Sequence, residues 1–425
     1  MPLRNVMFLF MTAIVSFGCY LKAERNRYAA QVAEAMKVVS DLYVEPVEQR
    51  QLFEHAMEGM LEGLDPYSAY VGPEVFQAME QSLDQEFGGV GIEVEKKTDE
   101  DPILVLTPLF DSPAYHAGLR SGDQILAIDG ESTMGMKPKD AILRMRGKPG
   151  SLVKLLIRHA DSPEELPVEV TRAIIVVDSL LGDTRRPDGT WDFHLRGNPR
   201  IGYLRLVTFG KHSAMELRQV LGDGRGCPFD AVILDLRDNA GGLLDTAVET
   251  CDMFLDAGRI VSTRGRDGVD RRVYEATPST VISDSIPLVI LINKYSASAS
   301  EIVAGCLQDH GRAIVMGERS WGKGTVQNLF ELEGGRSALK LTTATYWRPS
   351  NKNIHRRENA PENEDWGVRP NEGYEMVLTD DQWKELYAAR RERDTGRRNP
   401  QASPDVDQPV DPHVQRAREY HEAKL

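Results

Sequence analysis

Side chains that can carry out chemistry gather in one stretch, Pro287–Gln327. An apolar run over 288–292, bounded by a proline and an Asn-Lys-Tyr turn, predicts a buried strand. Three serines follow it at alternate positions: Ser296, Ser298 and Ser300. An apolar stripe of helical period comes next, and a second short strand then leads to a glycine-rich turn with Lys323. A serine at a strand-to-helix turn, followed by one lysine, supplies the side chains of a nucleophile and its base.

Lysine can act as such a base only in its neutral form. Its free pKa is about 10.4, so lowering it to about 7 means destabilising the ammonium by roughly 4–5 kcal/mol. Burial among apolar groups shifts a lysine pKa in this direction and by this much. The side chains of Trp321 and Val326, together with the two strands, are the expected apolar walls around Lys323.

The same serine also fits a purely structural interpretation. Ser298–Glu301 reads S-x-x-E, which is a capping box immediately before the apolar helical stripe. Capping and catalysis do not exclude each other, because a helix N-terminus supplies free N–H groups and a positive dipole end where an anion can form.

A phosphate-binding loop is a second alternative. The segment Gly317–Gly324 nearly matches a Walker loop, but the residue after Lys323 is glycine where that loop needs Ser or Thr to hold magnesium. Nucleotide binding is therefore disfavoured, and the turn is better interpreted as a support for the lysine.

A Ser–His–Asp triad is a third alternative. Asp309 and His310 lie close to the serines in sequence, but neighbours along a helix point in different directions, so the two cannot both relay to Ser298. A more distant histidine, His194 or His212, stays open as a partner without further support in the sequence.

Composition places the chain among soluble globular proteins of two or three domains. It has 425 residues, of which 41% are hydrophobic and 27% charged. The net charge of −14 argues against nucleic acid as a partner. The four cysteines form no CxxC pair and the nine histidines are scattered, so we expect no metal and no other cofactor.

The N-terminus carries a targeting signal. An uncharged apolar run, Val6–Leu21, lies between Arg4 and Lys22. A helix of that length spans about 24 Å, less than the hydrocarbon core of about 30 Å. Residues 1–25 are therefore interpreted as a signal peptide or a short signal anchor, which predicts a protein of the periplasm or the extracytoplasmic face of the membrane. Cys19 resembles a lipoprotein acceptor, and cleavage, lipidation and retention of the segment stay open.

The rest of the chain divides into four segments that differ in composition and in the periodicity of their apolar residues. Residues 26–84 show helical periodicity, and residues 85–172 combine short strands with glycine turns. Residues 173–383 alternate strands and helices, and one continuous apolar run, 231–236, is typical of a sheet covered on both faces. Residues 384–425 are rich in charge and then in proline, which predicts a frayed helix and a disordered tail.

The second segment resembles a PDZ domain of the bacterial protease type. Ser112–Gly130 follows the pattern S-P-A-x-x-A-G-L-x-x-G-D-x-I-L-x-I-x-G. Such a module adds a peptide strand to a sheet edge and holds the peptide's terminal carboxylate with backbone N–H groups. The expected groove helix is Met134–Arg146. The expected peptide-binding loop consists of Gly89, Val90, Gly91 and Ile92.

Three motifs of the third segment carry a wider resemblance. They are D-L-R-D-N-A-G-G at Asp235–Gly242, S-A-S-A-S-E ending at Glu301, and G-K-G-T-V-Q ending at Gln327. Over roughly residues 26–380 the chain resembles the carboxy-terminal processing (tail-specific) serine protease family. The resemblance implies an α/β fold with a ClpP/crotonase-like catalytic core, an inserted PDZ domain and an N-terminal helical segment.

The resemblance also assigns roles. It implies that Ser298 is the nucleophile, Lys323 the general base and Gln327 the residue that orients the lysine. Asp309 matches an acidic position with a supporting role. The backbone N–H groups implied for the oxyanion hole belong to Gly242 and Ala299.

We therefore predict a serine endopeptidase with a Ser298–Lys323 dyad, which cleaves proteins from or near their unstructured C-termini outside the cytoplasm. An activating adaptor and a homo-oligomer are compatible with this prediction. A non-catalytic PDZ scaffold on a crotonase-like body is the main alternative. An acyl-CoA enzyme of the crotonase type is a second, and the PDZ pattern and the lack of a basic pocket pattern argue against it.

Overall fold

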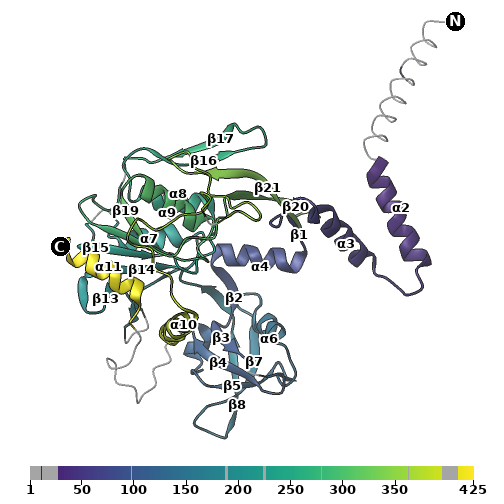
Figure 1. Cartoon of the computed structure of the whole chain (residues 1–425). Coiled ribbons are helices and arrows are strands. Elements are labelled where there is room, and N and C mark those ends of the chain that lie inside the picture. Colours follow the sequence, from purple (N-terminus) through teal and green to yellow (C-terminus); the bar gives the residue numbers. More distant parts are fainter. Residues whose placement is uncertain are drawn as a thin grey trace, which may run out of the picture. The chain divides into compact units, whose positions relative to one another are not determined.

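The structure is a computed structural model (Figure 1). It describes residues 11, 27–96, 98–186, 190–223, 226–278, 280–361, 363–394 and 410–425. Apart from Met11, the predicted signal segment Val6–Leu21 lies outside these residues. Among the described residues, no helix combines the length and the apolar character needed to cross a bilayer. The chain forms two compact units, Met1–Phe76 with Gln327–Thr342, and Gln77–Val326 with Thr343–Leu425.

The first unit joins the N-terminal helices to a strand from much later in the chain. Its elements are α2 (Arg27–Leu42), α3 (Gln49–Glu62) and β1 (Ala69–Val71). Strand β1 pairs antiparallel with β21 (Ser337–Trp347), with Tyr70 opposite Leu339. Val71, Phe76 and Ala338 form its small core. Strand β1 follows a turn at Asp65-Pro66, where the sequence predicts that the helices end.

The second unit contains the predicted PDZ segment as a sheet of its own. The sheet has the order β3-β4-β5-β7-β8, so β3 is an edge strand. Its strands are β3 (Ile92–Glu95), β4 (Ile103–Pro108), β5 (Gln124–Ile128), β6 (Glu131–Ser132, paired with β5), β7 (Leu152–Arg158) and β8 (Glu165–Thr171). Val153, Leu155 and Ile157 alternate along β7 and lie in the buried core, as period-2 patterning requires.

Two helices belong to this segment, α5 (Pro113–His116) and α6 (Pro138–Met145). The predicted groove helix, Met134–Arg146, begins four residues too early, because Pro138 takes the first helical position and fixes the start of α6 there. Strand β2 (Glu86–Gly89) pairs antiparallel with β9 (Ala173–Val176), which brings the two ends of the segment together. The segment is therefore an insertion.

A mainly parallel sheet forms the centre of the second unit. Its order is β10-β14-β15-β18-β19, and the pairs from β14 to β19 are parallel. Its strands are β10 (Leu180–Leu181), β13 (His194–Leu195), β14 (Asn198–Leu206), β15 (Ala231–Asp235), β18 (Leu288–Ile292) and β19 (Ala313–Gly317). Every residue of β15 and β18 is buried, as the apolar run 231–236 predicts.

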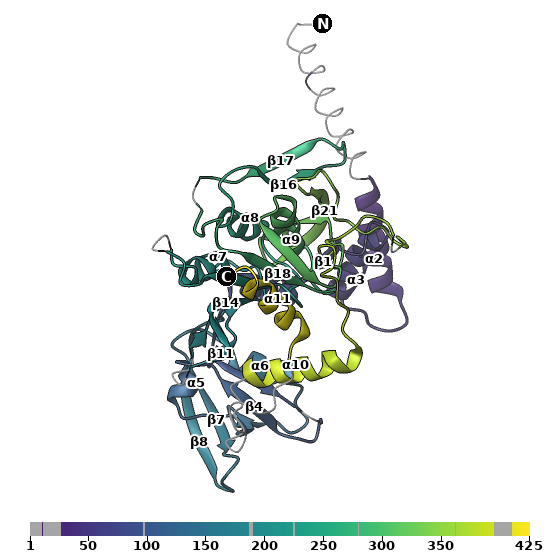
Figure 2. The same cartoon turned by 60° about the vertical axis from the view of Figure 1, so that its left-hand side comes forward.

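Helices cover both faces of this sheet (Figures 1 and 2). On one face, alternate residues such as Leu234 and Ile290 join the main core with α7 (Ser213–Val220), α8 (Leu244–Asp252) and α9 (Ala299–Asp309). On the other face, Ile233 and Leu291 pack with Ala417 of α11 (Pro412–Glu422). The remaining strands are β11 (Thr184–Arg185), β12 (Trp191–Asp192), β16 (Arg259–Arg264), β17 (Asp270–Glu275) and β20 (Thr325–Leu332). The predicted α/β fold class with an inserted PDZ segment is confirmed.

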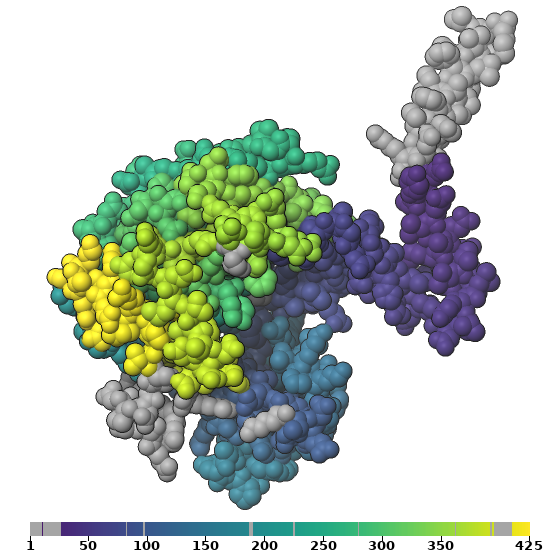
Figure 3. All heavy atoms as spheres, in the orientation of Figure 1, coloured from purple at the N-terminus to yellow at the C-terminus, as the bar shows by residue number. Residues whose placement is uncertain are grey.

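The C-terminal segment differs in part from the predicted frayed helix and disordered tail over 384–425. Helix α10 (Asp380–Asp394) agrees with the predicted helix, whereas α11 occupies 412–422, where the tail was predicted. Residues 395–409 lie outside the described residues. The side chain of Asp411 caps α11 by accepting from two backbone N–H groups, and Pro412 occupies its first turn. Figure 3 shows α11, in yellow, lying against neighbouring parts of the chain, and its Ala417 belongs to a buried core cluster. Composition hid this helix because its buried face uses alanine and histidine rather than large apolar residues.

Candidate functional site

Ser298 lies where strand β18 turns into helix α9. It is the residue before the helix, only 8% exposed, with φ 57° and ψ −113°. A positive φ is costly for a residue with a Cβ, and such strain is typical of functional turns. The serines on either side have structural partners, since Ser296 Oγ donates to the Leu236 carbonyl at 2.8 Å and Ser300 Oγ to the Asn239 carbonyl at 2.9 Å.

The buried carboxylate of Glu301 connects the Ser298 turn to the Lys323 turn. Its Oε2 accepts from the Ser298 N–H and the Lys323 N–H, each at 2.8 Å. Its Oε1 accepts from the Ser320 hydroxyl and the Gly322 N–H, each at 2.6 Å. Burial raises the pKa of Glu301, and these hydrogen bonds oppose that rise. The carboxylate thus holds the backbones of both predicted dyad residues on one oxygen atom.

The predicted capping box is present, and in it the Ser298 N–H donates to Glu301 Oε2 at 2.8 Å. The Ser298 hydroxyl makes no strict hydrogen bond to the helix N-terminus. It lies instead within hydrogen-bonding reach of the Tyr346 hydroxyl, which is buried on β21. Burial raises the pKa of Tyr346, so this phenol is neutral at physiological pH. Tyr346 was not predicted from the sequence. The alternating apolar and polar residues of β21 were the pattern that could have indicated its buried position.

Two backbone hydrogen bonds hold the loop around Lys323. The Arg356 N–H donates to the Gly322 carbonyl, and the Tyr346 N–H to the Gly324 carbonyl, both at 2.8 Å. Gly322 has φ 90°, and a Cβ there would lie 2.6 Å from Arg356 Cβ, so the glycine is required. Lys323 is half-buried. Of the two predicted apolar walls, Val326 packs against the main core, whereas Trp321 is 50% exposed and shields the site only in part.

The glycines of the Asp235–Gly242 loop approach the nucleophile turn closely. A Cβ on Gly241 would lie 2.9 Å from Ser298 Cβ and 3.0 Å from the Ala299 nitrogen. Asn239 fixes the approach, because its Oδ1 accepts from the Gly241 N–H at 2.8 Å and its carbonyl accepts from the Ala297 N–H at 3.0 Å. The structure therefore brings the predicted oxyanion loop against the predicted nucleophile.

The two predicted oxyanion donors, the N–H groups of Gly242 and Ala299, lie outside the backbone pairing of their surroundings. Gly242 forms a parallel bridge with Phe209 that uses the Gly241 carbonyl and the Leu243 N–H, leaving the Gly242 N–H outside the pair. Ala299 is the first residue of α9, where a helix offers its N–H no internal partner. Among the hydrogen bonds of the residues that the structure describes, neither N–H acts as a donor.

Asp309 lies at the opposite end of α9 from Ser298, about 16 Å along an 11-residue helix. Its two carboxylate oxygens accept from the Arg348 guanidinium at 2.5 and 3.1 Å, and Oδ2 also accepts from the Ser350 N–H. Both ion-pair partners are nearly buried. Its position suits a support for the helix that carries Ser298 rather than a part in bond making.

Gln327 lies on β20, in the first unit. Its Nε2 donates to Thr342 Oγ1 of β21 at 3.3 Å. The predicted peptide-binding loop lies in the PDZ segment, where Val90 is buried and its carbonyl accepts from the Ala114 N–H at 2.9 Å. A Cβ on Gly91 would collide with Ser112, so glycine is required there. Gly89 ends β2, and Ile92 begins the edge strand β3.

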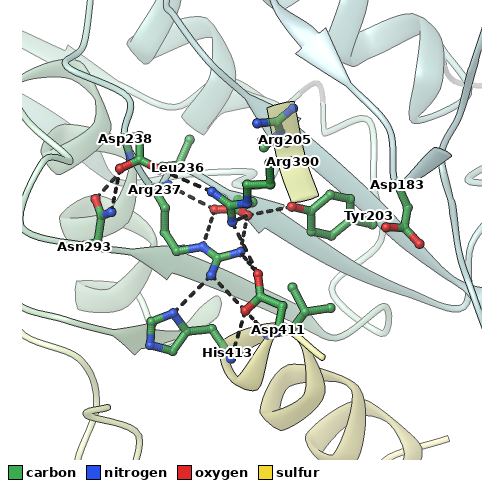
Figure 4. Close-up of polar contacts among 12 residues, drawn as sticks. Asp183, Tyr203, Arg205, Leu236, Arg237, Asp238, Asn293, Arg390, Asp411 and His413 are labelled. Carbon is green, nitrogen blue, oxygen red and sulfur yellow. Dashed lines mark hydrogen bonds and ion pairs between the residues drawn. The ribbon is translucent and has the colours of Figure 1, made fainter. Parts of the chain in front are cut away.

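A second buried cluster, shown in Figure 4, lies at the start of the Asp235–Gly242 loop. Arg237 donates to both oxygens of Asp235 and to both oxygens of Asp411 from the C-terminal segment. Arg390 of α10 reaches Asp235 at 3.1 Å. Burial raises the pKa of Asp235, but the two guanidinium groups outweigh it and hold that pKa far below its usual range. The cluster was not predicted from the sequence, because Arg390 was expected in a frayed helix and Asp411 in a disordered tail.

Comparison with known proteins agrees with this geometry. The model of "Peptidase family S41" matches residues 200–371, that of "PDZ domain" residues 108–159, and that of "Activating protease CtpB N-terminal domain" residues 20–75. The chain belongs to the carboxy-terminal-processing protease family, peptidase family S41. The resemblance stated from the motifs is thereby confirmed.

Two curated relatives support the assignment. The "Carboxy-terminal-processing protease" of Bartonella bacilliformis is 36% identical over 93% of this chain and 90% of its own length. The "Carboxy-terminal processing protease CtpB" of Bacillus subtilis is 32% identical over 81% of this chain and 69% of its own. A solved structure, "Photosystem II D1 C-terminal processing protease", is 27% identical over 81% of this chain and 92% of its own, with a TM-score of 0.43. The family assignment depends on the curated relatives rather than on this superposition.

Proposed function

We propose that this peptidase is a serine endopeptidase whose nucleophile is Ser298 and whose general base is Lys323. The observation that carries the proposal is the shared Glu301 oxygen, which accepts from the backbone N–H groups of both residues. The strained φ of Ser298 and its position against Gly241 add independent support. A serine paired with a neutral lysine is an established way to activate a hydroxyl.

In the proposed reaction, the neutral amine of Lys323 takes the proton as Ser298 Oγ attacks the scissile carbonyl carbon. The carbonyl oxygen becomes an oxyanion that accepts from the N–H groups of Gly242 and Ala299, a contribution of about 3–4 kcal/mol for one such donor. The lysine then gives its proton to the leaving amine, and an acyl-enzyme on Ser298 remains. Water, deprotonated by the same amine, hydrolyses this ester and frees the serine. Gln327, four residues after the lysine, would orient the amine.

We propose unstructured protein C-termini as the substrates, in line with the names of the two relatives. The edge strand β3, with the loop Gly89–Ile92 before it, offers a peptide the strand pairing that PDZ domains use. The apolar segment before residue 22 supports a location outside the cytoplasm. An activating adaptor and a homo-oligomer fit this proposal. Residues 26–84, 85–172 and 173–383 are the proposed N-terminal, PDZ and catalytic domains.

Ser298→Ala and Lys323→Ala test the dyad, assayed on a folded protein with an appended apolar tail. Both variants should lose cleavage by several orders of magnitude while their circular dichroism and thermal unfolding stay close to those of the parent. Undiminished cleavage by both variants would contradict the proposed mechanism.

A further inference from the structure

The turn Asp65–Ser68 of the first unit holds a carboxylate against strand β21. Asp65 Oδ1 accepts from the N–H groups of Tyr67 at 2.8 Å and Ser68 at 3.0 Å, and Oδ2 accepts from the Ser68 hydroxyl at 2.6 Å. Oδ1 also accepts from the hydroxyl of Thr342 at 3.0 Å, and the Thr342 N–H donates to Ser68 Oγ at 3.1 Å. The turn thus engages both the backbone and the side chain of Thr342.

The Thr342 hydroxyl is also the partner of Gln327. Gln327 Nε2 donates to Thr342 Oγ1 at 3.3 Å. Asp65, Thr342 and Gln327 therefore form a three-membered hydrogen-bond chain within the first unit. Asp65 of the N-terminal segment supplies the charged end of this hydrogen-bond chain.

The charge of Asp65 fixes which group donates and which accepts in this hydrogen-bond chain. Burial raises the pKa of Asp65, but its hydrogen bonds outweigh that effect and the net pKa lies below the ordinary value. An ionised carboxylate can only accept, so the Thr342 hydroxyl must donate to it. The hydroxyl oxygen is then left to accept from Gln327. The amide of Gln327 must therefore turn its NH₂ group toward Thr342 and its carbonyl away from it.

We propose that Asp65 and Thr342 are positioning residues that fix the amide direction of Gln327. This inference rests on the proposed function, in which Gln327 orients the amine of Lys323. A carbonyl that accepts from the lysine leaves the nitrogen lone pair available for the serine proton. A reversed amide would donate to that lone pair and block the step.

Four variants of the full chain test the direction of the amide. Thr342→Val removes the hydroxyl at nearly constant volume, and Thr342→Ser keeps it. Asp65→Asn keeps the shape of the side chain, but its amide can donate to Thr342, which allows the hydrogen bonds from Asp65 to Gln327 to reverse their direction. Thr343→Val, one position along the same strand and on its opposite face, is the matched control. Each variant is assayed for kcat, KM and the pH dependence of kcat, with thermal unfolding as the folding check.

Thr342→Val and Asp65→Asn should lower kcat on the order of 10- to 100-fold with KM little changed, the scale expected for a misaligned catalytic group. The acid limb of their pH profiles should move to lower pH, because the ammonium loses its acceptor. Thr342→Ser and Thr343→Val should stay near the parent. If Thr342→Val does not fold, the nearly isosteric Asp65→Asn carries the test.

Three results would overturn the inference: an unchanged kcat in Asp65→Asn, equal losses in Thr342→Val and Thr343→Val, or a loss of kcat without movement of the acid limb. These outcomes are distinguishable from failure of the proposed function. That failure would appear as activity retained in Ser298→Ala and Lys323→Ala, whatever happens at Thr342.

Discussion

One buried side chain, Glu301, has a larger role than its sequence position indicates. The capping box predicts one hydrogen bond, which the Ser298 N–H donates to the Glu301 carboxylate. The structure adds three more donors, all from the segment that carries Lys323. A buried acceptor with four donors stabilises the site only while every donor keeps its partner. Glu301 therefore couples the position of the proposed base to that of the proposed nucleophile.

Replacing Glu301 with glutamine should separate this coupling from simple helix capping. An amide NH₂ facing backbone donors leaves buried groups unpaired, so we expect a loss of about 1–3 kcal/mol in the free energy of unfolding. The loss of alignment should lower kcat at least tenfold. Urea unfolding and peptide cleavage measure the two effects. Glu249→Gln, on the exposed side of α8, is the control and should change neither quantity. Unchanged cleavage in Glu301→Gln would refute the coupling.

Gly242 offers a second test at the residue scale. It has φ 152°, and a Cβ there would collide with the Phe209 carbonyl oxygen. Gly242→Ala should therefore displace the proposed oxyanion donor and lower kcat by roughly 10²–10³-fold, the effect of losing one such donor. Gly59→Ala is the matched control, since nothing lies within 4 Å of its Cβ position. It should retain activity and gain slightly in stability, because it lies inside helix α3. Comparable activity in the two variants would contradict the assignment of Gly242.

The motifs predict the chemical groups of the proposed site more readily than they predict the contacts among these groups. Ser298, Lys323 and the loop ending at Gly242 are marked by short patterns that need little context. Tyr346 and the additional donors to Glu301 come from strands and turns distant in sequence. Their approach depends on tertiary packing, which a single sequence does not display.

At the scale of elements, strand β18 and helix α9 follow directly from the apolar run and the helical stripe of the sequence. The start of α6 was wrong by four residues, because Pro138 occupies the first helical position and fixes the start of the helix there. Helix α11 was missed altogether. It buries His413 and His421 against the sheet, and polar residues of this kind are indistinguishable from a solvated tail until their partners are known.

The buried histidines of α11 predict a loss of stability in acid. The ring of His421 contacts the Val232 carbonyl, and burial lowers its pKa to about 4. Burial also lowers the pKa of His413, and the nearby Arg237 adds to the effect. Below the ordinary pKa of about 6.5, the unfolded chain binds protons that the folded chain excludes. Stability should therefore be complete above that pH and fall as the pH drops toward 4.

For His421 alone the loss between pH 7 and pH 5 is on the order of 2 kcal/mol. Hydrogen exchange of the α11 amides at the two pH values measures it. His421→Leu should reduce the difference between the two pH values. A difference equal to that of the parent would show that His421 does not carry the pH dependence.

At the scale of the molecule, the C-terminal segment packs against the proposed catalytic domain. Asp411 and Arg390 are far from Arg237 in sequence, yet the three meet in the cluster of Figure 4 at the start of the Asp235–Gly242 loop. Removing one partner of a buried ion pair typically costs about 3–5 kcal/mol, because the remaining charge stays buried and unpaired. The loop that carries the proposed oxyanion donor is thus supported from the C-terminal end of the chain.

Truncation after Pro409 tests this dependence. The shortened chain loses α11 and Asp411 and exposes one face of the sheet, so its thermal unfolding should occur at least 10 °C lower on the scale of such losses. Cleavage should fall even at temperatures where the shortened chain remains folded. Truncation after Ala423, which keeps α11 whole, is the control. Full activity and stability after truncation at Pro409 would show that the segment is dispensable.

The central claim is that Ser298 becomes acylated and that Lys323 makes this possible. Mass spectrometry after treatment with a serine-reactive active-site probe tests it most directly. The account predicts one labelled peptide, with the mass increase on Ser298. It also predicts strongly reduced labelling in Lys323→Ala and unchanged labelling in the matched surface variant Lys294→Ala. Labelling at another residue, or equal labelling of Ser298 with and without Lys323, would contradict it.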